Sequence, residues 1–348
     1  MRIAIVSIPY KPTPPRGYGG IERVVYELVE ELVRRGHDVT LFATPGSYCS
    51  GRTVEVPDYD PSKAPSGITG GMSWISEEPL YRSMKEYLSD NPVDVIHDWS
   101  FENTFVRRHP ETFPFLISTC IPPPPDYERV NLVAASRAHS RLFDPPVPYV
   151  HYGINLGSYP FSPNKPEPII HIAKIAPYKG QHIAVLAAFL ARKPLTVAGN
   201  VESTRYFNWV MKPLFRLIPS VKYIGEIPGT AQFLKGACAL VQTPRWFDVL
   251  PLVIIESLAC GTPVIAFEQG GISEQIIDGV NGYLCHCFAD LVRAMKNVNK
   301  LNPCACREVA EKRFHVRRMA EEYEALYARV IKGEKWFARS VNFRNSLS

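Results

Sequence analysis

The feature that most constrains the fold of this chain is a repeated alternation of short aliphatic runs with helical patterns. Residues 2–7 form a β-branched run, and residues 21–35 then carry apolar side chains at helical spacing until Gly36. A second aliphatic run follows at 39–43, and the alternation continues along the chain. Because strands that alternate with helices form parallel sheets covered by helices, the sequence predicts an α/β protein.

The alternation falls into two sets on either side of a Pro-rich segment, 144–168, which we interpret as a hinge. The predicted strands are 2–7, 39–43, 93–97, 115–119 and 132–136 before the hinge, and 169–172, 195–198, 221–224, 239–242 and 264–266 after it. The predicted helices are 21–35, 79–89, 180–192, 204–217, 230–237, 256–260, 272–277, 288–298 and 306–331. We therefore expect two doubly wound domains, 1–155 and 156–315, and a C-terminal helix and tail, 316–348, that packs back toward the first domain.

Length and composition agree with a soluble two-domain protein. The 348 residues exceed the size at which a single core stops growing, and 46% are hydrophobic and 21% charged. No apolar run reaches the roughly 20 residues that span a bilayer. The N-terminus is too short for a signal-peptide core and has no small-residue cleavage site, so we expect a cytoplasmic location.

Charge is divided unevenly between the two halves. Residues 1–160 carry a net charge of −4 and the remainder +9, which together give the formal +5. A basic second half fits an anionic ligand such as a nucleotide phosphate, although a generally cationic surface explains it equally well. No basic stripe is interleaved with aromatic residues, so the sequence does not favour nucleic acid as a partner.

The eight cysteines indicate neither a zinc site nor a disulfide scaffold. Four of them stand singly in apolar surroundings, as expected of buried thiols: Cys49, Cys120, Cys238 and Cys260. The others form two C-x-C pairs, Cys285 with Cys287 and Cys304 with Cys306, whereas structural zinc sites usually need C-x2-C spacing. A disulfide between the two pairs remains open, and free thiols are the favoured interpretation.

The stretch WFDVLPLVIIESLACGTPVIA, residues 246–266, places one carboxylate on each side of a turn between a strand and a helix. Asp248 precedes the turn, and we expect Glu256 to open a helix that ends at Gly261. Two carboxylates are poorly suited to a core because each charge needs a polar partner or water. They suit the hydroxyl groups of a sugar or ribose, with the amides of the turn facing phosphate.

Two lysines stand in the first loop after the hinge. Lys174 and Lys179 follow the strand at 169–172, and Gly180 opens the next helix. Two cations beside a helix N-terminus would bind a diphosphate, whereas isolated lysines are more often solvated. Asp248 and Glu256 are predicted beyond strand ends of the same domain, where ligands of open α/β sheets collect, which favours a binding site.

The first domain carries weaker signals. Gly17, Gly19 and Gly20 precede its first helix and could admit an anion, or could only make the loop flexible. The glycines do not follow the G-x-G-x-x-G pattern, and no acidic residue ends the strand at 39–43, so NAD binding is disfavoured. His97 and Asp98 end a strand, where a lone histidine is more often structural than catalytic.

In these motifs the chain resembles the GT-B glycosyltransferases, and within them the retaining family 4. The resemblance covers nearly the whole chain and is carried by GYGGIERVVYELVEELVRRGHDVTLFA, AKIAPYKG, KYIGEI, the stretch at 246–266 and GGISEQIIDGVNGYL. It implies two Rossmann-like domains that face a cleft, with a nucleotide sugar held mainly by the second. It also implies a transferase that needs no metal and no cofactor, whose leaving phosphate takes the proton of the acceptor.

The resemblance assigns roles to individual residues. Lys174 and Lys179 match the cationic pair that neutralises the leaving diphosphate, Asp248 an acid that contacts the transferred sugar, and Glu256 the carboxylate that binds the ribose. His97 is a further candidate catalytic residue. The other residues implied in donor binding are Gly19, Gly20, Gly225, Glu226, Val249, Leu250, Pro251 and Leu252.

The chain departs from the family pattern at four positions. Asp248 replaces a common glutamate, Pro251 a common glycine, and Lys174 the usual arginine, which keeps the charge but loses bidentate geometry. Trp99 stands where many members have a second histidine, which weakens a catalytic role for His97. An altered sugar preference follows from these differences.

The acceptor is expected on the first domain, at loops 10–20, 47–78 and 120–129. The basic and aromatic C-terminal residues Lys335, Trp336, Phe337 and Arg339 suggest either peripheral membrane contact or, as the favoured interpretation, a disordered tail. Two other functions stay open: a sugar-nucleotide epimerase, which would need extra carboxylates for acid–base chemistry, and a binding protein without turnover.

Overall fold

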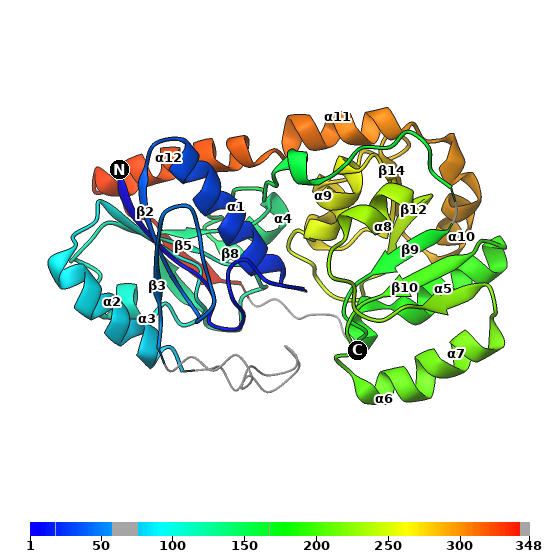
Figure 1. Ribbon diagram of the computed structural model, residues 1–348, viewed down its shortest axis with the longest axis horizontal. Helices are drawn as coiled ribbons and strands as arrows, with labels where there is room; N and C mark the ends of the chain where they lie inside the picture. Colours follow the sequence, from blue (N-terminus) through cyan, green and yellow to red (C-terminus); the bar gives the residue numbers. More distant parts are fainter. Residues whose placement is uncertain (18, 58–75, 167, 342–348) are drawn as a thin grey trace. The chain divides into compact units, whose positions relative to one another are not determined.

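The computed structural model describes residues 1–17, 19–57, 76–166 and 168–341. They divide into two compact units (Figure 1). Unit 1 comprises Met1–Gly153 together with the described residues from Val316 onward, and unit 2 comprises Ile154–His315. Within the loop at 47–78, which we associate with the acceptor, residues 58–75 lie outside the described part of the chain.

Unit 1 is built on a parallel sheet in the order β3-β2-β1-β4-β5-β7. Its strands are β1 Arg2–Val6, β2 Asp38–Ala43, β3 Arg52–Glu55, β4 Val95–Asp98, β5 Phe115–Ser118 and β7 Leu132–Val133. The central strands are continuous apolar runs because both faces of a parallel sheet are covered, and Ile3 to Val6 are fully buried. The strand β3 is absent from the prediction because its short sequence, RTVE, has no apolar run.

The helices of unit 1 pack on this sheet through apolar stripes. The predicted stripe of α1, which includes Val24, Leu28 and Leu32, is buried. α12 contacts α1, β4 and β5, although it comes from the far end of the chain. The helices are α1 Gly20–Arg34, α2 Glu78–Asp90, α3 Thr104–Arg108, α4 Arg137–Ser140 and α12 Val316–Ile331.

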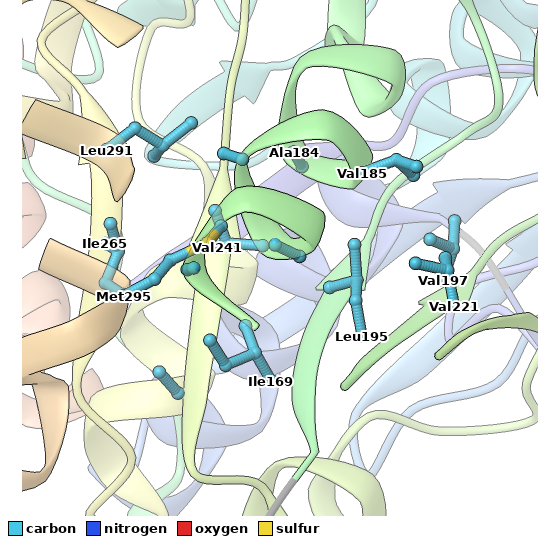
Figure 2. Packing of buried hydrophobic residues seen from close by; sticks show 14 of the residues in the cluster. Ile169, Ala184, Val185, Leu195, Val197, Val221, Val241, Ile265, Leu291 and Met295 are labelled. Carbon is cyan, nitrogen blue, oxygen red and sulfur yellow. The ribbon is translucent and has the colours of Figure 1, made fainter. Parts of the chain in front are cut away.

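Unit 2 repeats the architecture, with a parallel sheet in the order β11-β10-β9-β12-β13-β14. Its strands are β9 Ile169–Ile172, β10 Leu195–Ala198, β11 Val221–Tyr223, β12 Ala239–Gln242, β13 Val264–Phe267 and β14 Gly282–Cys285. Side chains from one face of this sheet, such as Val197, Val241 and Ile265, pack against Ala184 of α5 and Met295 of α10 (Figure 2).

The helices of unit 2 largely occupy the predicted positions. They are α5 Gln181–Ala191, α6 Thr204–Tyr206, α7 Lys212–Leu217, α8 Ala231–Gly236, α9 Leu252–Ala259, α10 Phe288–Asn297 and α11 Pro303–Arg313. The π-turn η4, Phe207–Met211, joins α6 to α7, so 204–217 is one continuous helical segment. Shorter 3₁₀ turns are η2 Leu156–Ser158, η3 Pro177–Lys179, η5 Gly270–Glu274 and η6 Val298–Lys300.

Three predicted elements are wrong in detail. The helix expected at 256–260 begins at Leu252, because its first turn is apolar on all sides and shows no helical period. The helix expected at 306–331 is two helices that end and begin around Phe314 and His315, where His315 bridges to Ile154. The helix expected at 272–277 is the 3₁₀ turn η5.

The C-terminal segment is a strand where the sequence favoured a disordered tail. β15 Phe337–Ser340 lies between β6 Glu128–Val130 and β8 Phe143–Asp144 in a small antiparallel sheet of unit 1. The indole of Trp336 donates a hydrogen bond of 2.7 Å to the carbonyl oxygen of Leu132. A charged, aromatic sequence is therefore ordered here by pairing with strands that lie far away in the sequence.

Two further predictions concern membrane and thiol chemistry. Within the described ranges, no helix is long and apolar enough to cross a membrane. All eight cysteines are described, and each is a free thiol; Cys238 and Cys260 are buried as expected, whereas Cys49 and Cys120 are only partly buried.

Candidate functional site

The strand order of unit 2 fixes where its ligand site can lie. From β9 the chain moves outward to β10 and β11, and it later returns to the other side of β9 as β12. The loops that follow β9 and β12 therefore diverge at the carboxyl edge of the sheet, the switch point where open α/β sheets bind ligands. Lys174 and Lys179 belong to the first of these loops, and Asp248 belongs to the second.

The loops after β9 and β12 are in close contact at Gly180. This residue has φ +68° at the end of η3, and a Cβ atom added to it would collide with the carbonyl oxygen of Thr243. The Thr243 hydroxyl donates a hydrogen bond of 2.8 Å to the carbonyl oxygen of Gly180. Glycine is required here both for the backbone conformation and for the close approach of the β12 loop.

Lys179 and Asp248 form the centre of the site. The ammonium nitrogen lies 2.7 Å from Oδ2 of Asp248, and both side chains are largely buried. The same nitrogen lies 5.1 Å from the ring centroid of Trp246 and 5.7 Å from that of Tyr178. The aromatic rings limit the hydration of the ammonium group, so the ion pair is held at a defined position.

A third loop holds the backbone of Asp248. The amide of Gly271 donates a hydrogen bond of 2.8 Å to the carbonyl oxygen of Asp248. Gly270 has φ +60°, and an added Cβ atom would collide with that same carbonyl. The GGISE sequence, which contributed to the family resemblance, therefore fixes the position of Asp248.

Lys174 has a partner that the sequence did not reveal. Its ammonium nitrogen lies 3.0 Å from Oε2 of Glu202, a residue in the loop after β10. The hydroxyl of Tyr178 donates to the other carboxylate oxygen of Glu202 at 2.7 Å. No local motif marks Glu202, but it is the only acidic residue between positions 180 and 224, which is a usable signal.

Glu256 lies one turn inside α9 and has its own set of partners. Its carboxylate accepts hydrogen bonds from the hydroxyls of Tyr159, at 3.0 Å, and Thr230, at 2.8 Å. The residue is 3% exposed. Each carboxylate oxygen has two acceptor positions, so the group can accept a further hydroxyl from a ligand that reaches it.

The predicted donor-site residues 249–252 of unit 2 form the stretch of chain that leads into α9. Val249 and Leu250 are buried, and Pro251 precedes α9 with φ −65° and accepts a hydrogen bond from the side chain of Gln275. Leu252 is the first residue of α9. These four residues place the amino end of an eight-residue helix just after the loop of Asp248.

Gly225 and Glu226 follow the edge strand β11. Gly225 has φ +81°, and its carbonyl oxygen accepts a hydrogen bond of 2.8 Å from the amide of Gly199. A Cβ atom at Gly199 would collide with the carbonyl oxygen of Ala173. The loops after β9, β10 and β11 are thus in close backbone contact, and Glu226 is exposed beside them.

In unit 1 the predicted glycines define the start of α1. Gly19 is the residue before the helix, and an added Cβ atom would press into the ring of Pro15 at 2.6 Å. Gly20 is the first helical residue. Packing against Pro15 explains a glycine at position 19, and a role of Gly19 in donor binding stays a prediction.

His97 is inside the core of unit 1. The ring is fully buried and lies 2.7 Å from the hydroxyl of Tyr327 and 2.8 Å from that of Ser118, one partner for each nitrogen. Burial lowers the pKa of His97 to about 3, so the ring is neutral. Trp99 packs 5.0 Å away and is itself 1% exposed. This geometry fits the structural interpretation of His97 and leaves its nitrogens no access to a substrate within unit 1.

A buried pair of carboxylates in unit 1 was not predicted. Oε1 of Glu77 accepts hydrogen bonds from the amides of Phe101 and Glu102. The charge of Asp98 is close enough to influence the ionisation of Glu77. Burial, followed by the charge of Asp98, raises the pKa of Glu77 to about 7. Burial also raises the pKa of Asp98.

A cavity of about 390 Å³ opens at the carboxyl ends of β4 and β5 in unit 1. The predicted loop at 120–129 forms one side of it through Pro123, Pro124 and Tyr127, while Arg107 and Arg129 supply positive charge. The loop therefore borders a cavity large enough for a small polar molecule, at the position where unit 1 would be expected to bind one.

Two family models match the chain in the order of its units. The model described as "Glycosyltransferase Family 4" matches residues 18–110, and the model described as "Glycosyl transferases group 1" matches residues 160–313. The second match contains every residue of unit 2 that the sequence predicted for the donor site.

Three known proteins illustrate what this chain is similar to in sequence and structure. A glycogen synthase of Mycobacterium tuberculosis is 25% identical, and the alignment covers 86% of each chain. The crystal structure of AviGT4, a glycosyltransferase involved in avilamycin A biosynthesis, has a TM-score of 0.76 at 23% identity and covers 96% of this chain and 99% of its own. Anabaena HepE in complex with UDP has a TM-score of 0.68 at 16% identity, with 94% and 100% covered.

Proposed function

Because the chain belongs to the family 4, group 1 glycosyltransferases and has the GT-B fold, we propose that it transfers a sugar from a nucleoside diphosphate donor to an acceptor hydroxyl with retention of configuration. The observation that carries this proposal is the convergence of Lys174, Lys179 and Asp248 on the switch point between β9 and β12.

The chemistry requires charge separation along one bond. As the bond between the anomeric carbon and the diphosphate breaks, positive charge develops on the sugar ring and negative charge on the leaving group. Lys174 and Lys179 are cations fixed before the reaction, so they stabilise the leaving diphosphate more in the transition state than in the ground state. In this proposal they take the place that a divalent metal has in other transferases.

Asp248 has two tasks in this scheme. In the described structure it orients Lys179 through the 2.7 Å ion pair. With a donor bound, its second carboxylate oxygen accepts hydrogen bonds from hydroxyls of the transferred sugar, while Glu256 accepts them from the ribose. The leaving phosphate removes the proton of the acceptor hydroxyl, so the same-face reaction needs no nucleophile from the protein.

We assign the acceptor to unit 1. The cavity beside the loop at 120–129 is the part of this unit that supports the assignment best, because it combines apolar walls with Arg107 and Arg129. Anabaena HepE was solved with UDP, and its similarity to this chain favours a nucleotide-sugar donor without selecting the base or sugar.

The proposal is tested by a thermal-shift screen of UDP-, GDP- and ADP-sugars, followed by assays of nucleoside diphosphate release with and without EDTA. We expect one donor class to stabilise the native chain, and the response to be smaller in Lys179→Ala and Glu256→Ala. Lys312→Ala, on exposed α11 of the same unit, is the matched control. Equal stabilisation of all four proteins, or of none, would refute the donor site, and loss of turnover with EDTA would refute metal independence.

A further inference from the structure

One side of unit 2 combines exposed apolar residues with positive charge. The helix α5 and the helical segment Thr204–Leu217 follow consecutive strands, β9 to β10 and β10 to β11. Right-handed crossovers in the same direction place both helices on one side of the sheet, and α5 contacts η4. We call their outer side the α5–α7 surface.

Large apolar side chains of this surface stand in solvent. Trp209 is 79% exposed and Leu217 77%, while Phe189 is 54% and Leu190 53% exposed. Leu186, Phe189 and Leu190 are spaced as one face of α5, opposite the alanines that pack on the sheet. Large exposed apolar side chains on two neighbouring helices mark an interaction surface.

The charge of the same segment is almost entirely positive. Residues 180–224 contain a single acid, Glu202, which is largely buried beside Lys174. They contain six basic residues outside the lysine pair of the site: Arg192, Lys193, Arg205, Lys212, Arg216 and Lys222. In α10, the helix on the other side of α5, Asp290 is paired with Arg293 at 3.1 Å and so adds no net negative charge.

We propose that the α5–α7 surface binds anionic lipid membranes, with Trp209, Leu217 and the α5 residues entering the interface and the basic residues facing lipid phosphates. Aromatic and aliphatic side chains beside Lys and Arg are the combination that amphipathic helices use at a bilayer surface. Each cation near an anionic surface raises the affinity about fivefold, so several of them hold the protein without a membrane-spanning segment. This inference goes beyond the proposed reaction and does not depend on it.

A second copy of this chain is the principal alternative occupant. Two copies meeting through this surface would bring like charges together, since both faces are basic, and like-charge contacts oppose association. An anionic bilayer complements both the apolar and the charged part of the surface. Charge complementarity therefore favours an anionic membrane over a second copy as the occupant of the α5–α7 surface.

The test measures sedimentation of the full chain with vesicles of phosphatidylcholine alone or of phosphatidylcholine mixed with phosphatidylglycerol. We expect binding only to the mixed vesicles, and weaker binding at high salt. Replacing two cations, Arg205→Gln with Arg216→Gln, should lower the partition coefficient on the order of 30-fold. Replacing two apolar residues, Trp209→Ser with Leu217→Ser, should lower it by at least about tenfold.

Two exposed positions elsewhere serve as controls. Lys312→Gln changes charge on α11 of unit 2, and Phe337→Ser removes an exposed aromatic residue from β15 of unit 1. Both should bind as the native chain does, and all variants should keep the native thermal shift with the donor. No binding to mixed vesicles, or equal binding by all variants, would overturn the proposal. A dimer in gel filtration that the Trp209 and Leu217 changes dissociate, without vesicle binding, would overturn it in favour of a second copy.

Discussion

Lys179 Nζ and Asp248 Oδ2 lie 2.7 Å apart, although the two residues are separated by 69 positions in the chain. One follows β9 and the other follows β12, so the pair spans the point where the strand order reverses. The ion pair holds a cation in place before any substrate arrives. This prearrangement is what an electrostatic mechanism needs.

Removing the charge of Lys179 should therefore impair catalysis more than binding. We expect Lys179→Ala to lower kcat by about 100-fold or more, because charge on the leaving diphosphate is greatest in the transition state. Lys179→Arg should recover part of the rate. The measurement is the steady-state release of nucleoside diphosphate, and a variant that changes only KM would contradict the assignment.

Glu202 should reduce the affinity of the site for diphosphate by neutralising Lys174. In Glu202→Gln the Tyr178 hydrogen bond can persist while one negative charge is lost. We expect the nucleoside diphosphate product to bind about fivefold more tightly at low ionic strength, and the gain to fade in high salt. Calorimetric titration measures this, with Glu311→Gln on exposed α11 as the control. Unchanged or weaker binding would show that the charge of Glu202 does not weaken diphosphate binding.

Alanine variants of Gly270 and Gly279 can distinguish the effect of backbone strain from the effect of displacing Asp248. Both have positive φ, +60° and +74°, but an added Cβ atom meets the Asp248 carbonyl only at Gly270. The positive φ alone should cost alanine about 1–2 kcal/mol of stability at either position, and the collision at Gly270 adds to this cost. Only Gly270→Ala should also weaken the thermal shift caused by the donor. If both variants lose that shift equally, Asp248 is not positioned by this contact.

The buried carboxylate of Glu77 should make unit 1 less stable as the pH rises. Its pKa is about 7 in the folded protein and 4.5 ordinarily, so the folded state retains the proton over the interval between these values. The stabilisation is complete below about pH 4.5 and is lost as the pH rises through 7, with a total on the order of 3 kcal/mol. We expect Glu77→Gln to raise the melting temperature at pH 8 and to change it little at pH 5. Equal effects at both pH values would show that Glu77 is ionised when folded.

His97 should contribute to stability and not to turnover. His97→Phe leaves the buried Tyr327 hydroxyl unpaired, while the Ser118 hydroxyl keeps its 2.9 Å contact with Tyr323, so a loss of about 1–3 kcal/mol is expected. Below the melting temperature, donor turnover per folded molecule should remain near the native value. A large fall in kcat with an unchanged melting temperature would restore the catalytic interpretation.

The sequence located the central strands because buried parallel strands are continuous apolar runs. β9, β10 and β12 begin and end at the predicted residues. The weak elements lie at the edges, where β3 has the sequence RTVE and β14 the sequence GYLC, too short and mixed to show a period. β15 is stable only through its partners β6 and β8, which no local pattern could reveal.

In the candidate site, too, the sequence revealed residues that local patterns mark and missed those that only long-range contacts bring in. Lys174, Lys179 and Asp248 were predicted because their loops follow recognisable strands. The partners Glu202, Tyr159 and Thr230 were not, since each contact joins residues more than twenty positions apart. The start of α9 was missed because Leu252 to Ile255 are apolar whichever structure they adopt.

The assignment of α12 and β15 to unit 1 has a consequence for synthesis of the chain. Unit 2 is an insertion within the sequence of unit 1, and α12 provides Tyr323 and Tyr327, which bind Ser118 and His97 in the unit 1 core. On the ribosome, the first 153 residues emerge long before these partners are made. Unit 2 can complete its own fold while unit 1 still waits for its last helix, so the N-terminal half of the chain is the last to be finished.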